Sequence, residues 1–119
     1  MILNVDEKTF TKEVLGSSIP VLINFWAPWC SLCRIVQPLL IDIQKDWGDQ
    51  IKLVNINADE NFKLANTYRL TSLPTVLVVK DGDTRYRLDE FRNRDDLRAA
   101  SSVIQATLED MVVAYRYTA

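Results

Sequence analysis

Histidine is absent from this chain of 119 residues, and cysteine occurs only twice, at Cys30 and Cys33. Without an imidazole, the chain has no Ser-His-Asp or Cys-His triad and no histidine metal ligand. Two cysteines do not complete a tetrahedral zinc or iron–sulfur site, so such a site would require a second chain to supply the other pair. We therefore expect no metal site.

The sequence also lacks a long apolar run, an amino-terminal leader and an excess of charge of one sign. No apolar run approaches the roughly 20 residues that span a bilayer, and residues 1–6 do not have the pattern of a secretory signal. Fourteen basic residues stand against 16 acidic ones, and the arginines between Arg85 and Arg98 alternate with acidic residues. This pattern is typical of a solvated mixed-charge face, so we expect neither nucleic acid nor membrane as a partner. A cytoplasmic location is the expectation.

Hydrophobic periodicity divides the chain into alternating strands and helices. Strands are expected at 20–27, 51–57, 75–79 and 84–88, with a weak one at 2–5. Helices are expected at 6–16, 30–48, 62–68 and from 94 or 95 to 117, and Asp81-Gly82 has the composition of a hairpin turn. The order predicts one α/β domain over residues 1–119, in which a mixed sheet of four or five strands has helices on both faces.

Apolar residues at helical spacing predict which helix faces are buried. The first helix is expected to begin at Asp6 and to bury Phe10, Val14 and Leu15. Pro38 is expected to kink or break the second helix. The second helix has an apolar stripe at Leu32, Ile35, Val36, Leu39, Leu40, Ile43 and Trp47. The last helix has one at Leu97, Ala100, Ile104, Leu108, Met111, Val112 and Tyr115.

Cys30 and Cys33 lie where the first long strand gives way to a helix. Cysteines at i and i+3 can close a disulfide and reopen it, and free N–H groups at the helix start stabilise the thiolate of the first one. A single CxxC in a chain without a leader is typical of a redox pair rather than a structural staple. The alternative is two buried cysteines that act only as small apolar side chains.

The residues around this pair agree with one known family. Phe25-Trp26-Ala27-Pro28-Trp29-Cys30-x-x-Cys33 follows a strand, Pro38 lies inside the next helix, and Leu73-Pro74-Thr75 opens a later strand. This pattern resembles the thioredoxin family, and the resemblance runs from the first helix to about Ala106. It implies a thioredoxin fold, thiol–disulfide oxidoreductase activity without an organic cofactor, disulfide-containing protein targets and a thioredoxin reductase as electron donor.

The resemblance also implies roles for single residues. Cys30 matches the exposed attacking cysteine and Cys33 the deeper resolving one. Pro74 matches a cis-proline that faces the sulfurs and, with Leu73, helps to bind the substrate chain; the alternative is an ordinary trans proline at a strand start. Trp29 matches the aromatic residue beside the site, where packing and partner contact are both open.

Four differences from the family pattern cluster around the cysteines, and two of them are at Asn24 and Asn55. Ser31 and Leu32 stand where thioredoxins usually carry Gly-Pro, which should change the redox potential. Glu90 and its neighbours stand where the family has a glycine beside the site, so we expect a narrower or more acidic platform for the target. Trp26, in contrast, agrees with the family pattern. It matches an aromatic residue packed under the site, and core packing is its alternative role.

Asn24 and Asn55 stand where the family has a buried aspartate and often a lysine. An amide does not ionise, so Asn24 cannot serve Cys33 as a base. Losing both charges together is physically consistent, because two amides can satisfy each other by hydrogen bonds. The alternative for Asn55 is an ordinary polar strand residue.

The leading hypothesis is a protein-disulfide reductase that cycles Cys30 and Cys33 between dithiol and disulfide, with altered redox tuning and target choice. The alternative is a binding or redox-sensing module on the same fold with little general reductase activity. The last helix continues through about residues 107–117, past the usual end of the fold. That extension is either a longer docking helix or a surface for a partner or a second copy.

Overall fold

Strands and helices alternate as the hydrophobic pattern predicts, in a computed structural model that describes residues 2–118 and the side chains of residues 2–112. In chain order the elements are β1 (Ile2–Asn4), η1 (Thr11–Leu15), β2 (Val21–Trp26), α1 (Ser31–Trp47), η2 (Gly48–Gln50), β3 (Lys52–Asn57), η3 (Ala58–Glu60), α2 (Phe62–Thr67), β4 (Thr75–Lys80), β5 (Asp83–Leu88) and α3 (Arg94–Thr118). The predicted α/β class and the weak first strand are both confirmed.

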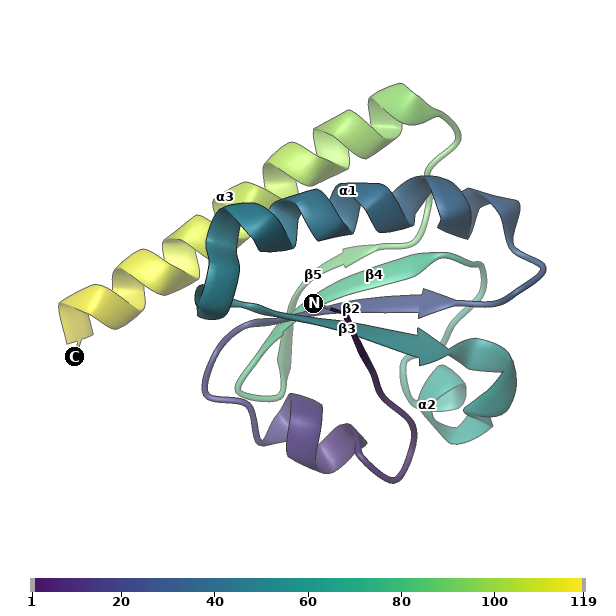
Figure 1. The fold of residues 1–119 in the computed structure, drawn as a ribbon, viewed down its shortest axis with the longest axis horizontal. Coiled ribbons are helices and arrows are strands. Elements are labelled where there is room, and N and C mark those ends of the chain that lie inside the picture. Colours follow the sequence, from purple (N-terminus) through teal and green to yellow (C-terminus); the bar gives the residue numbers. More distant parts are fainter. Residues whose placement is uncertain (1, 119) are drawn as a thin grey trace.

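The sheet has five strands in the order β1-β3-β2-β4-β5. β1, β3 and β2 are parallel, whereas β4 is antiparallel to both β2 and β5. β2 is therefore hydrogen-bonded on both edges, and its first five residues are buried because an unbroken apolar run suits a strand covered on both faces. Figure 1 shows α1 and α3 on one face of the sheet and α2 with η1 on the other.

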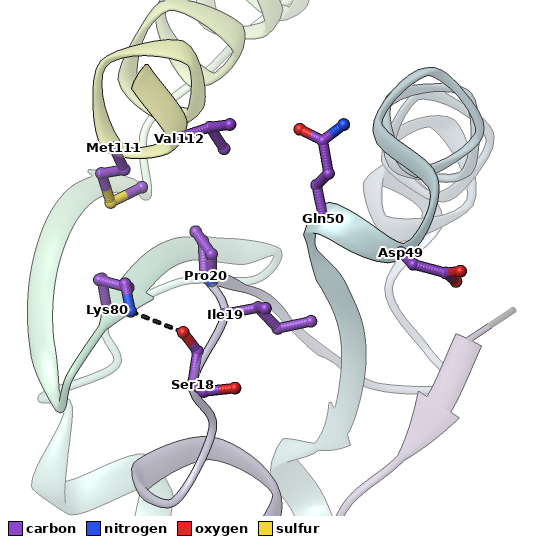
Figure 2. A pocket seen from close by; sticks show the side chains of 8 residues that line it. All are labelled: Ser18, Ile19, Pro20, Asp49, Gln50, Lys80, Met111 and Val112. Atoms are coloured by element: carbon purple, nitrogen blue, oxygen red, sulfur yellow. Dashed lines mark hydrogen bonds between the residues drawn. The ribbon is translucent and has the colours of Figure 1, made fainter. Parts of the chain in front are cut away.

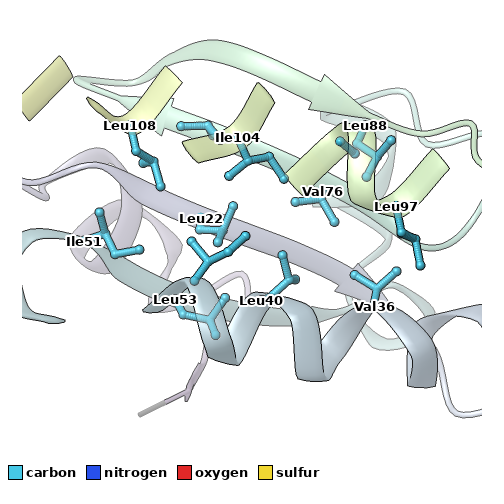
Figure 3. Packing of buried hydrophobic residues seen from close by; sticks show 13 residues of the cluster. Leu22, Val36, Leu40, Ile51, Leu53, Val76, Leu88, Leu97, Ile104 and Leu108 are labelled. Carbon is cyan, nitrogen blue, oxygen red and sulfur yellow. The ribbon is translucent and has the colours of Figure 1, made fainter. Parts of the chain in front are cut away.

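Alternation along the strands separates two apolar clusters, one on each face of the sheet. Leu22 and Leu53 pack under α1 and α3, whereas Ile23 and Phe25 belong to the cluster on the other face. Figure 3 shows how leucines and isoleucines from α1, α3 and the sheet meet in the first cluster. Asn24, two residues after Leu22, points to this same α1 face.

The first helical segment differs from the expected amphipathic helix. Phe10 and Val14 are buried as predicted, but Leu15 is 44% exposed. η1 is a π-helix, and its last turn is closed by a bond from the Gly16 N–H to the Thr11 carbonyl at 2.8 Å. Its turn is wider than that of an α-helix, so the α-helical spacing used for the prediction fails at Leu15.

α1 runs without interruption from Ser31 to Trp47 through Pro38, so the expected break at this proline is wrong. One row of α1 is fully buried against the sheet, and Leu39 and Trp47 pack partly against the same cluster. That buried row is Cys33, Val36, Leu40 and Ile43. Leu32 and Ile35 form a neighbouring row and are 37% and 43% exposed. The sequence stripe is wider than the surface that the sheet covers.

Burial along α3 continues past residue 107, into the part of the helix beyond the usual end of the fold. Leu108 is fully buried in the α1-side cluster, so the apolar stripe is still covered at this position. Met111 packs partly against the same cluster, and Val112 is partly exposed. The side chain of Tyr115 lies outside the described residues.

Candidate active site

Cys30 and Cys33 form a disulfide at the start of α1, with their Cα atoms 5.4 Å apart. The chain leaves β2 at Trp26, and the Cys30 N–H then donates to the Ala27 carbonyl at 3.1 Å. This turn makes Cys30 the N-cap of α1, and its Sγ accepts a hydrogen bond from the Cys33 N–H at 3.2 Å. The cap position is one that favours negative charge, because free N–H groups of the first helical turn converge there.

The disulfide is less exposed than the resemblance implied for an attacking cysteine. Cys30 is 5% exposed and Cys33 is 4% exposed. Their remaining surface lines a hollow of about 300 Å³, together with Trp26, Ala27, Pro28, Arg34 and Gln37. The expectation of an exposed Cys30 is therefore wrong for the closed disulfide, because the sulfur turns toward the Cys33 amide and away from solvent.

A second hollow, of about 360 Å³, lies on the other side of the first α1 turn. It is lined by Leu32, Ser72, Leu73, Pro74, Asp89, Glu90, Phe91 and Arg92. We call it the target groove. The Leu73–Pro74 peptide bond is cis, so the trans alternative is wrong. Glu90 lies in the groove wall, as its position in the sequence led us to expect.

Trp29 stands beside the disulfide and is 68% exposed. Its indole Nε1 donates to the Asp59 carboxylate at 2.9 Å, which fixes the ring at the surface. Asp59 follows β3, and its own N–H donates to Asn57 Oδ1 at 2.9 Å. Sequence reasoning missed Asp59, because nothing in the local pattern links it to a tryptophan 30 positions earlier.

Asn24 and Asn55 are opposite each other in the β2–β3 register and both are buried. Asn24 Nδ2 donates to Asn55 Oδ1 at 3.2 Å, so the predicted pairing of the two amides exists. The pairing is incomplete, because Asn24 Oδ1 has no hydrogen-bond partner among the described residues. An uncharged pair with one unused acceptor lies under the helix that carries the disulfide.

A third hollow lies at the opposite end of β2 and is drawn in Figure 2. It measures about 360 Å³ and is lined by Ser18, Ile19, Pro20, Asp49, Gln50, Lys80, Met111 and Val112. We call it the far pocket. Lys80 Nζ donates to the Ser18 carbonyl at 2.7 Å, and the lining contains no cysteine.

A CxxC disulfide at a helix N-terminus, beside a proline-lined groove on an α/β sheet, defines a thiol–disulfide oxidoreductase. The family model described as Thioredoxin matches residues 1–103. The chain belongs to the thioredoxin family, has the thioredoxin fold, and is a protein-disulfide reductase.

Relatives in bacteria and algae agree with this assignment. The chain is 50% identical over 78 residues to "Thioredoxin 1" of Synechococcus elongatus, covering 66% of this chain and 73% of that protein. It is 42% identical over 85 residues to "Thioredoxin" of Rickettsia bellii, covering 71% and 81%. It is 45% identical over 78 residues to "Thioredoxin M-type, chloroplastic" of Chlamydomonas reinhardtii, covering 66% and 56%.

Within residues 2–118, none of the helices combines the length and the apolar character that crossing a bilayer requires.

Proposed function

We propose that Cys30 is the attacking cysteine and Cys33 the resolving one in the reduction of protein disulfides. The Cys30 thiolate attacks one sulfur of the target disulfide, forms a mixed disulfide and releases the other target sulfur as a thiolate. Cys33, as its thiolate, then attacks Cys30 Sγ, which closes the Cys30–Cys33 disulfide and releases the second target thiolate. Two electrons pass from the dithiol to the target.

One observation carries this assignment of roles: Cys30 caps α1, whereas Cys33 lies one turn inside the helix. A sulfur at the N-cap receives the Cys33 N–H and the positive end of the helix dipole, which favour its thiolate at neutral pH. The Cys33 side chain lies on the buried row of α1, one turn further from the helix N-terminus than Cys30.

The target groove supplies the surface for the substrate chain in this proposal. Leu73 and Pro74 form one wall and Leu32 reaches it from between the cysteines. Trp29 stands beside the disulfide with a fixed ring, which suits contact with a target. Because Ser31 and Leu32 replace the usual residues between the cysteines, we propose a redox potential that differs from that of typical thioredoxins.

The electron donor in this proposal is a thioredoxin reductase, which returns two electrons to the Cys30–Cys33 disulfide after each cycle. We place the protein in the cytoplasm as a carrier of reducing equivalents to protein disulfides. The chain acts as one domain over residues 1–119, and the C-terminal part of α3 serves as a docking helix for the sheet, as the burial of Leu108 favours.

Trapping of the intermediate tests the roles of the two cysteines. Cys33→Ser should accumulate a mixed disulfide with insulin that survives non-reducing electrophoresis, because the resolving thiol is gone. Cys30→Ser should trap none, and both variants should lose turnover with thioredoxin reductase and NADPH. Trapping by Cys30→Ser instead of Cys33→Ser would reverse the assignment, and turnover by either variant would overturn it.

A further inference from the structure

The side chain of Arg87, on β5, joins two segments that are distant in sequence. Its Nη1 donates to the Tyr68 carbonyl and its Nη2 donates to the Arg69 carbonyl at 3.0 Å. Its Nε donates to the Asp89 carboxylate at 2.8 Å. All three nitrogens of the guanidinium are therefore engaged, although the side chain is 30% exposed.

The two carbonyls belong to the turn that follows α2. The Tyr68 N–H still bonds back to Leu64 and the Leu70 N–H to Ala65, whereas the carbonyls beyond the helix end have no helical partner. Arg69 has a φ of 50°, so the chain reverses there. A planar guanidinium suits two adjacent acceptors at once, which an ammonium group does not.

A second tie lies a few residues further along the same segment. Ser72 Oγ donates to the Asp89 carbonyl at 2.7 Å, and Thr75 Oγ1 donates to the Ser72 carbonyl at 2.8 Å. Asp89 therefore binds Arg87 through its carboxylate and Ser72 through its backbone. Residues 68–72 are therefore hydrogen-bonded to the end of β5 at two places. Arg87 binds the carbonyls of residues 68 and 69, and Asp89 binds Ser72.

These ties connect the two walls of the target groove. The fastened segment leads directly into Leu73 and Pro74, which form one wall. β5 leads directly into Glu90 and Phe91, which form the opposite wall. The contacts of Arg87 thus join the two chain segments that lead into the walls, although its side chain does not line the groove.

We infer that Arg87 is a positioning residue that fixes the width of the target groove and thereby the affinity for protein substrates. The inference rests on the proposed function, because it assigns the groove to the target chain. Arg87 contacts neither cysteine in the described structure. The rate at which the cysteine pair reduces a small disulfide, which does not need the groove, should therefore be unchanged when Arg87 is replaced.

Two substrates and one matched variant test this inference. Arg87→Ala should raise the KM for insulin at least about fivefold with kcat within about twofold, and leave the rate with the small disulfide DTNB within about twofold. Arg85→Ala removes the same charge from the same strand, and Arg85 is exposed without a hydrogen bond or ion pair among the described residues. Arg85→Ala should leave the KM for insulin, the kcat for insulin and the rate with DTNB unchanged.

A structural readout accompanies the kinetics. Amide hydrogen exchange in residues 68–74 should be faster in Arg87→Ala than in wild type or Arg85→Ala, with exchange in residues 52–57 unchanged. Arg87→Lys, which keeps the charge and reaches one carbonyl, should give an intermediate KM, and it carries the test if Arg87→Ala does not fold.

The kinetic results separate a failure of the Arg87 inference from a failure of the proposed function. An unchanged insulin KM in both Arg87 variants, or equal losses with insulin and DTNB, would overturn the positioning role. A wild-type protein that reduces neither disulfide would refute the proposed function, and the inference with it. Wild-type activity with an indifferent Arg87 refutes the inference alone.

Discussion

The two ends of β2 carry hollows of the same size, about 360 Å³, with different chemistry. At the amino end, the far pocket lies among Pro20, Met111 and Val112, with Lys80 bound to a backbone carbonyl (Figure 2). At the carboxyl end, the target groove adjoins the first turn of α1, which holds the disulfide. Size alone does not distinguish the two hollows.

The packing around the two ends is what differs. Near the far pocket, Ile51 and Leu108 are buried and continue the apolar cluster to the edge of the sheet. Near the disulfide, Trp29, Leu32 and Ile35 remain exposed. At the amino end of β2 the buried cluster reaches the edge of the sheet, whereas the carboxyl end carries the disulfide beside three exposed apolar side chains.

The largest expected change in stability comes from shortening a buried side chain near the far pocket. Leu108→Ala should lower the free energy of unfolding by about 2–5 kcal/mol, because it leaves a cavity in a fully buried position. Insulin reduction by the folded variant should stay within about twofold of wild type. Urea unfolding measures the first quantity. Leu32→Ala, at an exposed position, is the matched control and should change stability by less than about 0.5 kcal/mol. A similar loss in both variants would break the comparison.

The next expected effect is on the rate at which Cys33 resolves the mixed disulfide, because Asn24 cannot act as a base beside it. Asn24→Asp should speed resolution of the mixed disulfide on the order of tenfold near neutral pH, because a carboxylate can take the proton of Cys33. Stopped-flow tryptophan fluorescence across a range of pH measures this step. Asn55→Ala, which breaks the Asn24 hydrogen bond without adding a base, should give no gain. A rate that is unchanged or slower at every pH would contradict this account.

A smaller effect is expected from the cation of the far pocket. Lys80→Met should lower the free energy of unfolding by no more than about 1 kcal/mol, because the Ser18 carbonyl loses its charged donor at an exposed position that water can reach. Its kcat/KM for insulin should remain that of wild type. Lys12→Met, an exposed lysine on η1, should change neither quantity. Loss of activity in Lys80→Met would show that the far end takes part in the reaction.

The smallest effect is a change of stability in alkaline solution. Burial raises the pKa of Tyr68 above its ordinary value of 10.0, and its ring packs on Phe10 and Phe25. The fold favours the neutral phenol, so this contribution is complete below the unfolded-state pKa and is lost as pH rises through the folded one. Unfolding in urea from about pH 8 to about pH 11 should show Tyr68→Phe losing less stability than wild type, by under about 1 kcal/mol. Parallel curves would contradict the expected shift.

Much of the fold was predictable because the strands are apolar throughout and the turns have characteristic residues. Asp81 and Gly82 both adopt positive φ, as the hairpin pattern indicated. The exposed side chain of Leu15 was not predictable, because the sequence does not distinguish a π-helix from an α-helix. The burial of Leu108 depends on how far the sheet extends beneath α3, which local periodicity does not report.

The site was predictable where its residues are neighbours in sequence and unpredictable where they meet only in space. The cysteine pair and Pro74 belong to short motifs. Arg87 belonged to a mixed-charge stretch that we interpreted as a solvated face, and its carbonyl partners lie 18 and 19 positions away. The incomplete pairing of Asn24 likewise depends on side-chain geometry that only the folded chain defines.

The central place of β2 has a consequence for when the redox centre is lost. Strands bonded on both edges exchange their amide protons only when the whole molecule unfolds, whereas edge strands and terminal helices open separately. Cys30 follows β2 by four residues, so the sulfur pair is tethered to the part of the molecule that opens last. A molecule in which β5 or the end of α3 has unfolded locally should therefore still keep its Cys30–Cys33 pair in place and in its reduced state.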